Sequence, residues 1–300
     1  MNNPTRGILT IAGGSPMYGN LALSLCASIR AKSPEIGIAV AYTASAIERV
    51  EAQLKALNVQ LIELREDQYT DGQKRNFFKT KTFIYDLSPF DETLFMDSDT
   101  MWLNHDIDNF FNQFKDADFS ICNEGKINVR TGEDFTTNFY MFWADYDEIL
   151  SKYSTRLGDF FYQCRSEIIY FKKCRKTEKL FRVVRKIYDN PKISFTSIGG
   201  CLPDELAFNI ATSTCEIYPH KDKWIPAYWQ YREHKVSRTH MMKIEIASKF
   251  PILSVGGNVV TELIRNMYQG RNESNYKKLK IRGVASLKNK RDVLPERKRI

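Results

Sequence analysis

Two aspartates, Asp97 and Asp99, follow a short apolar run at residues 93–96 that has the character of a buried strand. Side chains two residues apart on a strand point the same way, so the two carboxylates are expected to project together while Ser98 turns aside. Converging carboxylates repel each other unless a cation or a proton lies between them. Oxygen ligands of this kind suit Mg²⁺ or Mn²⁺, with positions left open for phosphate oxygens. The spacing therefore predicts a divalent cation site at a strand end, where open α/β sheets bind their ligands.

Two other interpretations fit the same three residues. Asp and Ser are common in turns because they make local hydrogen bonds, and short motifs often occur by chance. An apolar strand followed by DxDxT also resembles the first motif of haloacid-dehalogenase-type phosphatases, in which Asp97 would be the nucleophile. That family places the motif near the start of its fold and supplies acidic metal ligands later, whereas here the motif comes late and no such acidic run follows.

The segment around the aspartates favours a different family. Residues 81–90 read KTFIYDLSPF and residues 91–100 read DETLFMDSDT. This block resembles the K…LSP[YF]DxTL[FY][LM]D[AS]DT block of GT-A glycosyltransferases and is most similar to the retaining, glycogenin-like family 8. The resemblance implies an α/β, Rossmann-like GT-A domain with a mostly parallel sheet, and a nucleotide-sugar donor such as a UDP-hexose. It places Asp97, Ser98 and Asp99 at the donor diphosphate, with Mn²⁺ or Mg²⁺ on the two aspartates.

Two more residues take catalytic places in this resemblance. Lys81 precedes Asp97 by sixteen residues (97 − 81 = 16), which is the place of the family's donor-binding lysine. An ammonium there would offset pyrophosphate charge as the leaving group departs. Residues 203–209 (PDELAFN) resemble a D[QE]xx[LF]N segment that puts Asp204 beside the reacting sugar and acceptor. Asp204 would equally suit the first turn of a helix, where the macrodipole favours carboxylates.

The first strand and its loop carry the donor-base part of the resemblance. Residues 11–20 (IAGGSPMYGN) are similar to the pocket in which Ala12 would line the base and Tyr18 would stack on a uracil. An ordinary loop aromatic is the alternative for Tyr18.

A later segment extends the resemblance to about residue 210. Residues 166–171 (SEIIYF) are similar to the strand that lines the sugar site, which assigns Ser166 and Glu167 to the donor. Arg165 stands where asparagine is usual, and a polar group at a strand start is the alternative for Glu167.

The third metal ligand departs from the family pattern. Family 8 enzymes supply it from a late histidine in an HxxGxKPW segment, whereas the similar run here, residues 250–257 (FPILSVGG), puts Ser254 in that slot. His240 is the candidate substitute. The predicted metal ligands are therefore Asp97, Asp99 and His240, or the two aspartates completed by phosphate and water.

Strand-like and helix-like patterns alternate around these segments, which predicts βαβ units and a largely parallel sheet. Expected strands lie at residues 7–12, 36–43, 59–64, 93–96 and 166–171, and expected helices at 21–29, 44–58, 176–188 and 203–212. These elements would form one GT-A transferase domain over residues 1–270.

The charge is unevenly distributed. The 300 residues hold 44 Lys and Arg against 36 Asp and Glu, a net charge of +8. Residues 277–300 contain ten basic and two acidic residues (10 − 2 = +8), so residues 1–276 sum to zero. This argues against a nucleic-acid groove spread over the fold. It predicts a basic tail at residues 271–300 that binds an anionic membrane surface or polyanion, or is simply solvated.

The remaining features narrow the class without naming the substrates. No apolar run of membrane-spanning length and no signal-peptide pattern is evident, and the six cysteines form no CxxC, so we expect a cytoplasmic protein with reduced thiols. No pattern identifies the donor sugar or the acceptor, which could be a glycan, a protein or a lipid. Arg165, the missing late histidine and the tail leave open a catalytically inactive relative that binds or scaffolds.

Overall fold

The computed structural model describes residues 5–103, 105–134, 143–153, 155–222, 224, 227–228 and 251–254. His240, the boundary at residue 270 and the basic tail lie outside these residues, so the expectations for them stay predictions. Within the described residues, no helix combines the length and the apolar character needed to cross a membrane. All six cysteines are described, and all are free thiols.

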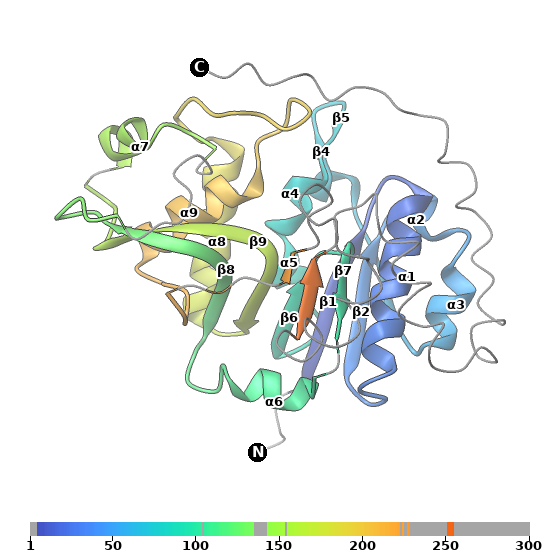
Figure 1. Ribbon diagram of the computed structural model, residues 1–300. Helices are drawn as coiled ribbons and strands as arrows, with labels where there is room; N and C mark the ends of the chain where they lie inside the picture. The colour runs from blue at the N-terminus through green and yellow to red at the C-terminus, as the bar shows by residue number, and fades with distance from the viewer. Residues whose placement is uncertain are drawn as a thin grey trace, which may run out of the picture.

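A six-stranded sheet in the order β3-β2-β1-β6-β9-β8 forms the centre of the molecule (Figure 1). Neighbours among β1, β2, β3 and β6 are parallel, whereas β9 is antiparallel to both β6 and β8. The predicted α/β class with a mostly parallel sheet is therefore confirmed. The strands are β1 (Arg6–Ala12), β2 (Gly37–Tyr42), β3 (Gln60–Glu63), β6 (Glu92–Met96), β8 (Phe119–Asn128) and β9 (Phe160–Lys172).

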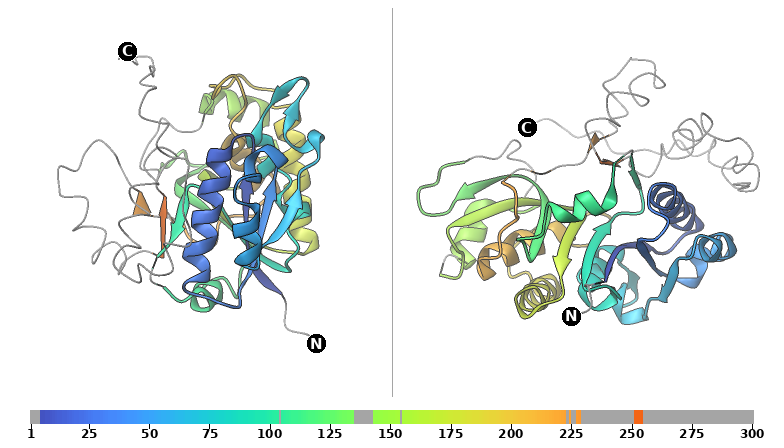
Figure 2. Two further views of the ribbon diagram at one scale, coloured as in Figure 1. Left: turned by 90° about the vertical axis from the view of Figure 1, so that its right-hand side faces the viewer. Right: turned by 90° about the horizontal axis from the view of Figure 1, so that it is seen from below.

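Strand alternation divides the apolar core into two layers on opposite faces of the sheet. Leu9 and Phe95 face one layer, which packs α8 (Arg175–Asp189) and α9 (Asp204–Cys215). Ile8 and Leu94 face the other, which packs α1 (Pro16–Arg30). Figure 2 shows α1 and α8 on the two sides of the strands.

Shorter elements complete the fold. A three-stranded sheet has the order β10-β11-β7, and β4 and β5 form a hairpin. These elements are η1 (Glu66–Gln68), β4 (Thr70–Asp71), β5 (Lys74–Arg75), α4 (Phe77–Lys81), α5 (Ile84–Leu87), β7 (Thr100–Trp102), α6 (Ile107–Asn112), α7 (Tyr146–Tyr153), β10 (Ala227–Tyr228) and β11 (Ile252–Ser254).

The strand order turns at β1, whose neighbours are β2 on one side and β6 on the other. The chain builds outward through β2 and β3 and then returns to the opposite side of β1. In open α/β sheets, ligands bind outside the carboxyl ends of the strands at such a switch point. Ala12 and Met96 end these two strands, so the predicted base loop and the predicted aspartates follow the two strands at this switch point.

One predicted helix, at residues 44–58, is wrong as a single element. The structure has two short helices, α2 (Ala44–Ile47) and α3 (Glu51–Ala56), separated at Val50, whose backbone leaves the helical region (φ −125°, ψ 1°). No glycine or proline marks the break. A Cβ on Gly19 of α1 would lie 2.0 Å from the Ala46 carbonyl oxygen and 3.2 Å from a Val50 methyl. Close packing against α1 therefore accompanies the break.

The predicted strand at residues 166–171 is the second half of a longer one. β9 begins at Phe160, so Glu167 lies inside the strand and the strand-start alternative for this residue is wrong. In the pairing with β8, Ile121 lies opposite Ile169, but the next residue, Cys122, lies opposite Arg165. Residues 166–168 of β9 therefore have no partner in β8 and form a bulge. Bulges often redirect side chains beside active sites. This one lies where β6 ends, since Met96 pairs with Ile168.

Candidate active site

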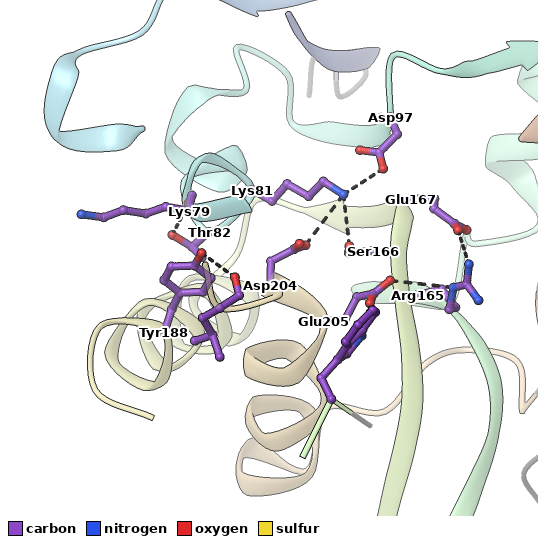
Figure 3. A network of polar contacts seen from close by, with 12 residues as sticks. Lys79, Lys81, Thr82, Asp97, Arg165, Ser166, Glu167, Tyr188, Asp204 and Glu205 are labelled. Atoms are coloured by element: carbon purple, nitrogen blue, oxygen red, sulfur yellow. Dashed lines mark hydrogen bonds and ion pairs between the residues drawn. The ribbon is translucent and has the colours of Figure 1, made fainter. Parts of the chain in front are cut away.

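Lys81 joins three of the predicted site residues. Its ammonium lies 2.8 Å from Asp97 Oδ2, donates to Ser166 Oγ at 3.1 Å, and lies 3.8 Å from Asp204 Oδ2 (Figure 3). Lys81 ends α4, Asp97 follows β6, Ser166 is in the β9 bulge and Asp204 begins α9. Burial lowers the pKa of Lys81, but Asp204 and Asp97 raise it more, so the side chain stays charged. The structure thus gathers four separated segments on one cation.

The aspartates lie in a turn and not on a continuing strand, so the strand-alternation argument for their convergence does not apply. β6 ends at Met96, and the Thr100 amide and hydroxyl both donate to the Asp97 carbonyl, at 3.0 and 2.6 Å. The Asp97 amide donates to the Glu167 carbonyl at 2.8 Å. The turn still keeps Asp99 near Asp97. Burial is the largest cause of the raised pKa of Asp97; Lys81 lowers this pKa, and the nearby Asp99 and Asp204 raise it.

The remaining residue of the turn, Ser98, is buried. Around Asp97, the contact with Lys81 therefore opposes both burial and the neighbouring carboxylates. A divalent cation would add positive charge there, and carboxylate oxygens are suitable ligands.

Asp204 is 2% exposed, and its Oδ2 atom has no hydrogen-bond partner. A buried carboxylate oxygen without a donor is unfavourable by about 1–3 kcal/mol or more, so its position favours a ligand. Pro203 is the N-cap residue of α9, which places Asp204 in the first turn, where the dipole also favours a carboxylate. The helix-start and functional interpretations are therefore compatible.

Glu205 extends the site beyond the sequence-predicted residues. Its carboxylate accepts a short hydrogen bond from Trp143 Nε1 and lies 3.8 Å from Arg165 Nε. Burial, and secondly the neighbouring Asp204, raise the pKa of Glu205 to about 7, while Arg165 and Lys81 lower it. Glu205 was missed because its helical neighbour Asp204 carried the motif, although the DE pair was visible in the sequence.

Arg165 gathers three glutamates around one guanidinium. Nη1 donates to Glu124 Oε1 and Nη2 donates to Glu167 Oε1, each at 2.7 Å, and Nε faces Glu205. Glu124 comes from a second bulge, in β8, where the register with β9 shifts between Asn123 and Lys126. The sequence marked Arg165 only as a departure from asparagine, and no local signal pointed to Glu124.

The predicted base loop lies on the other side of the aspartates. Ala12 is fully buried at the end of β1, and the next residue, Gly13, lies against Phe77, whose ring would be 2.2 Å from an added Cβ. Tyr18 lies in the first turn of α1, so the loop-aromatic alternative for it is wrong, and its side chain is 41% exposed. Burial, and then Asp99 and Asp97, raise the pKa of the Tyr18 phenol, which places this ring near the aspartates. Tyr18 and the end of β1 at Ala12 therefore lie on the same side of the sheet's carboxyl edge as the turn at residues 97–99, which we call the DSD turn.

Ser254, which stands in the place of the family's late histidine ligand, also lies next to the DSD turn. β11 pairs antiparallel with β7, with Ser254 opposite Thr100, the residue after Asp99. In the described part of the chain, no three His, Cys, Asp or Glu side chains are grouped to hold a metal. Two aspartates with open positions for phosphate and water remain the fitting donor set, and His240 stays a prediction outside the described residues.

Comparisons with known proteins find no matching protein-family profile and no matching curated sequence. Solved structures do match. Apo mouse xyloside xylosyltransferase 1 aligns with TM-score 0.50 and 12% identity over 83% of this chain and 97% of its own. The galactosyltransferase LgtC, solved with donor and acceptor sugar analogues, aligns with TM-score 0.51 and 10% identity over 84% and 88%.

The bifunctional glycosyltransferase WbbM aligns with TM-score 0.52 and 16% identity. The match covers 84% of this chain but 45% of WbbM, so this chain spans less than half of that protein. Identities this low establish architecture and not activity. From residue 5 onward, the described chain has the mixed α/β fold of GT-A-type glycosyltransferases.

Proposed function

We propose that this protein is a metal-dependent glycosyltransferase that transfers a hexose from a nucleotide sugar, specifically a UDP-hexose, to an acceptor with retention of anomeric configuration. The observation that carries the proposal is the position of the Lys81 ammonium, in contact with Asp97, Ser166 and Asp204 at the switch point of the sheet. The family 8 resemblance assigns Lys81, Asp97 and Ser166 to the donor and puts Asp204 beside the reacting sugar and acceptor. The shared fold of the solved glycosyltransferases supports it.

In this proposal Asp97 and Asp99 would hold Mn²⁺ or Mg²⁺ together with the diphosphate, and the bound ion would supply positive charge for the leaving group. Lys81 adds a fixed ammonium on the same side, so that part of the leaving group's charge is met by the protein itself. Ser166 orients that ammonium, and Asp204 holds a hydroxyl of the sugar or the acceptor. Tyr18 and the loop after Ala12 take the base.

The test is a thermal-shift titration of the full chain with Mn²⁺ and UDP. We expect a rise in Tm that requires both ligands and is lost in Asp97→Ala and Asp99→Ala. The control Asp116→Ala, at an exposed aspartate outside the site, should keep the shift. No response of the wild type to Mn²⁺ and any nucleoside diphosphate would refute donor binding.

Turnover separates the proposal from its two rivals. Slow hydrolysis of a UDP-hexose by wild type and not by Asp99→Asn supports the enzyme. Tight binding without turnover of any donor, across a panel of acceptors, supports a non-catalytic relative. Hydrolysis of a generic phosphomonoester with phosphate trapped on Asp97 would support the phosphatase alternative, which the GT-A-type fold disfavours.

A further inference from the structure

The two cations of the site are already paired with protein carboxylates. Lys81 lies 2.8 Å from Asp97 and 3.8 Å from Asp204. Arg165 directs its two terminal nitrogens at Glu124 and Glu167, and its Nε toward a third glutamate. A guanidinium recognises a carboxylate through its planar donors. Since glutamates occupy those donors here, neither described cation of this network is left for an incoming carboxylate.

Acidic groups outnumber these cations. Six carboxylates and two cations give a formal charge of −4 (2 − 6). Four of these carboxylates lie outside the DSD turn, and the side chain of each is at most 14% exposed. A divalent cation and a diphosphate roughly cancel each other, so the excess remains after donor binding. The six are Asp97, Asp99, Glu124, Glu167, Asp204 and Glu205.

In the proposed binding mode this excess would lie beside the sugar of the donor. With the base beside Tyr18 and the diphosphate at Asp97, the sugar would extend toward the start of α9 and the β9 bulge. Asp204 Oδ2, buried without a hydrogen-bond donor, faces this region beside Lys81 (Figure 3). A hydroxyl or ammonium on the sugar would donate to it, whereas a carboxylate would not.

We propose that this site selects nucleotide sugars whose sugar is neutral or carries an amino group, and rejects those whose sugar carries a carboxylate. The inference rests on the proposed function and names its donor class. A sugar carboxylate would enter a partly buried region lined by like charges without an unpaired cation from Lys81 or Arg165, which is strongly unfavourable. A neutral hexose meets no such repulsion.

The experiment is calorimetric titration of the wild-type chain, with Mn²⁺ present, by UDP, UDP-glucose and UDP-glucuronate. The two sugars differ at one carbon, which bears CH₂OH in one and a carboxylate in the other. We expect UDP-glucuronate to bind at least about tenfold more weakly than UDP-glucose. Equal or tighter binding of UDP-glucuronate, with UDP still bound, would overturn this inference and leave the proposed function standing.

Variants test whether charge is the cause. Glu124→Gln removes the carboxylate at Arg165 Nη1, and Glu167→Gln removes the one at Nη2. Each substitution should reduce the ratio of the UDP-glucuronate and UDP-glucose dissociation constants by several-fold, chiefly because UDP-glucuronate binds more tightly. Glu63→Gln, at an exposed residue on β3, should not. Circular dichroism shows whether each variant is folded. If both folded site variants keep the wild-type ratio of the two dissociation constants, charge repulsion is not the cause of the selectivity. If UDP itself fails to bind, the proposed function fails and this inference with it.

Discussion

The two sides of the switch point are built in different ways. On the β1 side, which we call the glycine edge, the Gly14 amide donates to Thr43 Oγ1 at 3.0 Å and its carbonyl accepts from Ser45 Oγ at 3.1 Å. Gly13 lies against Phe77, which stacks on Tyr69 with centroids 5.5 Å apart. Neutral hydrogen bonds and close contacts shape this edge.

The charged edge, formed by β9, the β8 bulge, the end of α4 and the start of α9, contains several ion pairs. Lys81 and Arg165 each form ion pairs with more than one carboxylate, so the carboxylates outnumber the cations. The glycine edge therefore depends on shape, whereas the charged edge depends on electrostatic balance. Substitutions that change volume should damage the first, and substitutions that change charge should damage the second.

The largest effect is expected from Lys81→Ala, which removes one of the two cations of the charged edge. The buried Asp204 and the partly buried Asp97 would be left without it, and breaking a buried pair in this way typically costs about 3–5 kcal/mol of unfolding free energy. Urea unfolding at pH 7 without added metal measures the loss.

The matched control is Lys55→Ala, which removes a lysine 2.6 Å from Glu51 on the exposed surface of α3. Water screens this pair, so the midpoint of unfolding should hardly move. Similar losses in the two lysine variants would contradict a special electrostatic dependence of the charged edge.

A smaller effect, about 2 kcal/mol or more, is expected from Gly19→Ala next to the glycine edge. The new methyl would lie 2.0 Å from the Ala46 carbonyl oxygen, and a backbone atom cannot rotate out of the way. The measurement is again urea unfolding.

Gly72→Ala is the comparison for that variant, because nothing lies within 4 Å of its added Cβ, although its φ of 61° is left-handed. Backbone strain alone should cost about 1 kcal/mol there. A Gly19→Ala loss no larger than that of Gly72→Ala would show that α1 and α2 can separate without penalty.

The smallest effect concerns the pH dependence of stability through Glu205. Its folded pKa of about 7 is above its unfolded value, so the folded state binds the extra proton and wild-type stability falls as pH rises toward and through 7. Glu205→Gln removes that dependence. Relative to wild type, the variant should gain on the order of 1 kcal/mol between pH 5 and pH 8.

Unfolding free energies of the two proteins at both pH values provide this measurement. If the unfolding free energy of the variant changes between pH 5 and pH 8 by the same amount as that of wild type, Glu205 titrates near its ordinary pKa. A variant that loses stability toward pH 8 would reverse the sign and place a net favourable charge interaction on Glu205.

Local patterns were sufficient for the parts of the site that depend on neighbours in the chain. The apolar run before Asp97 predicted β6 because strand burial follows from composition. The α9 start at Pro203 was predicted because proline suits a helix entrance. These features need only a few consecutive residues, so the sequence determines them by itself.

Long-range packing decided the rest. Glu124 reaches Arg165 only because facing bulges in β8 and β9 shift the register, and Ser254 reaches the DSD turn only because β11 pairs with β7. The helix expected at residues 44–58 breaks where α1 packs at Gly19. The sequence thus determined which residues could do chemistry and on which elements they lie. Tertiary structure alone decided which charges share a site, because register and packing depend on contacts between segments distant in the chain.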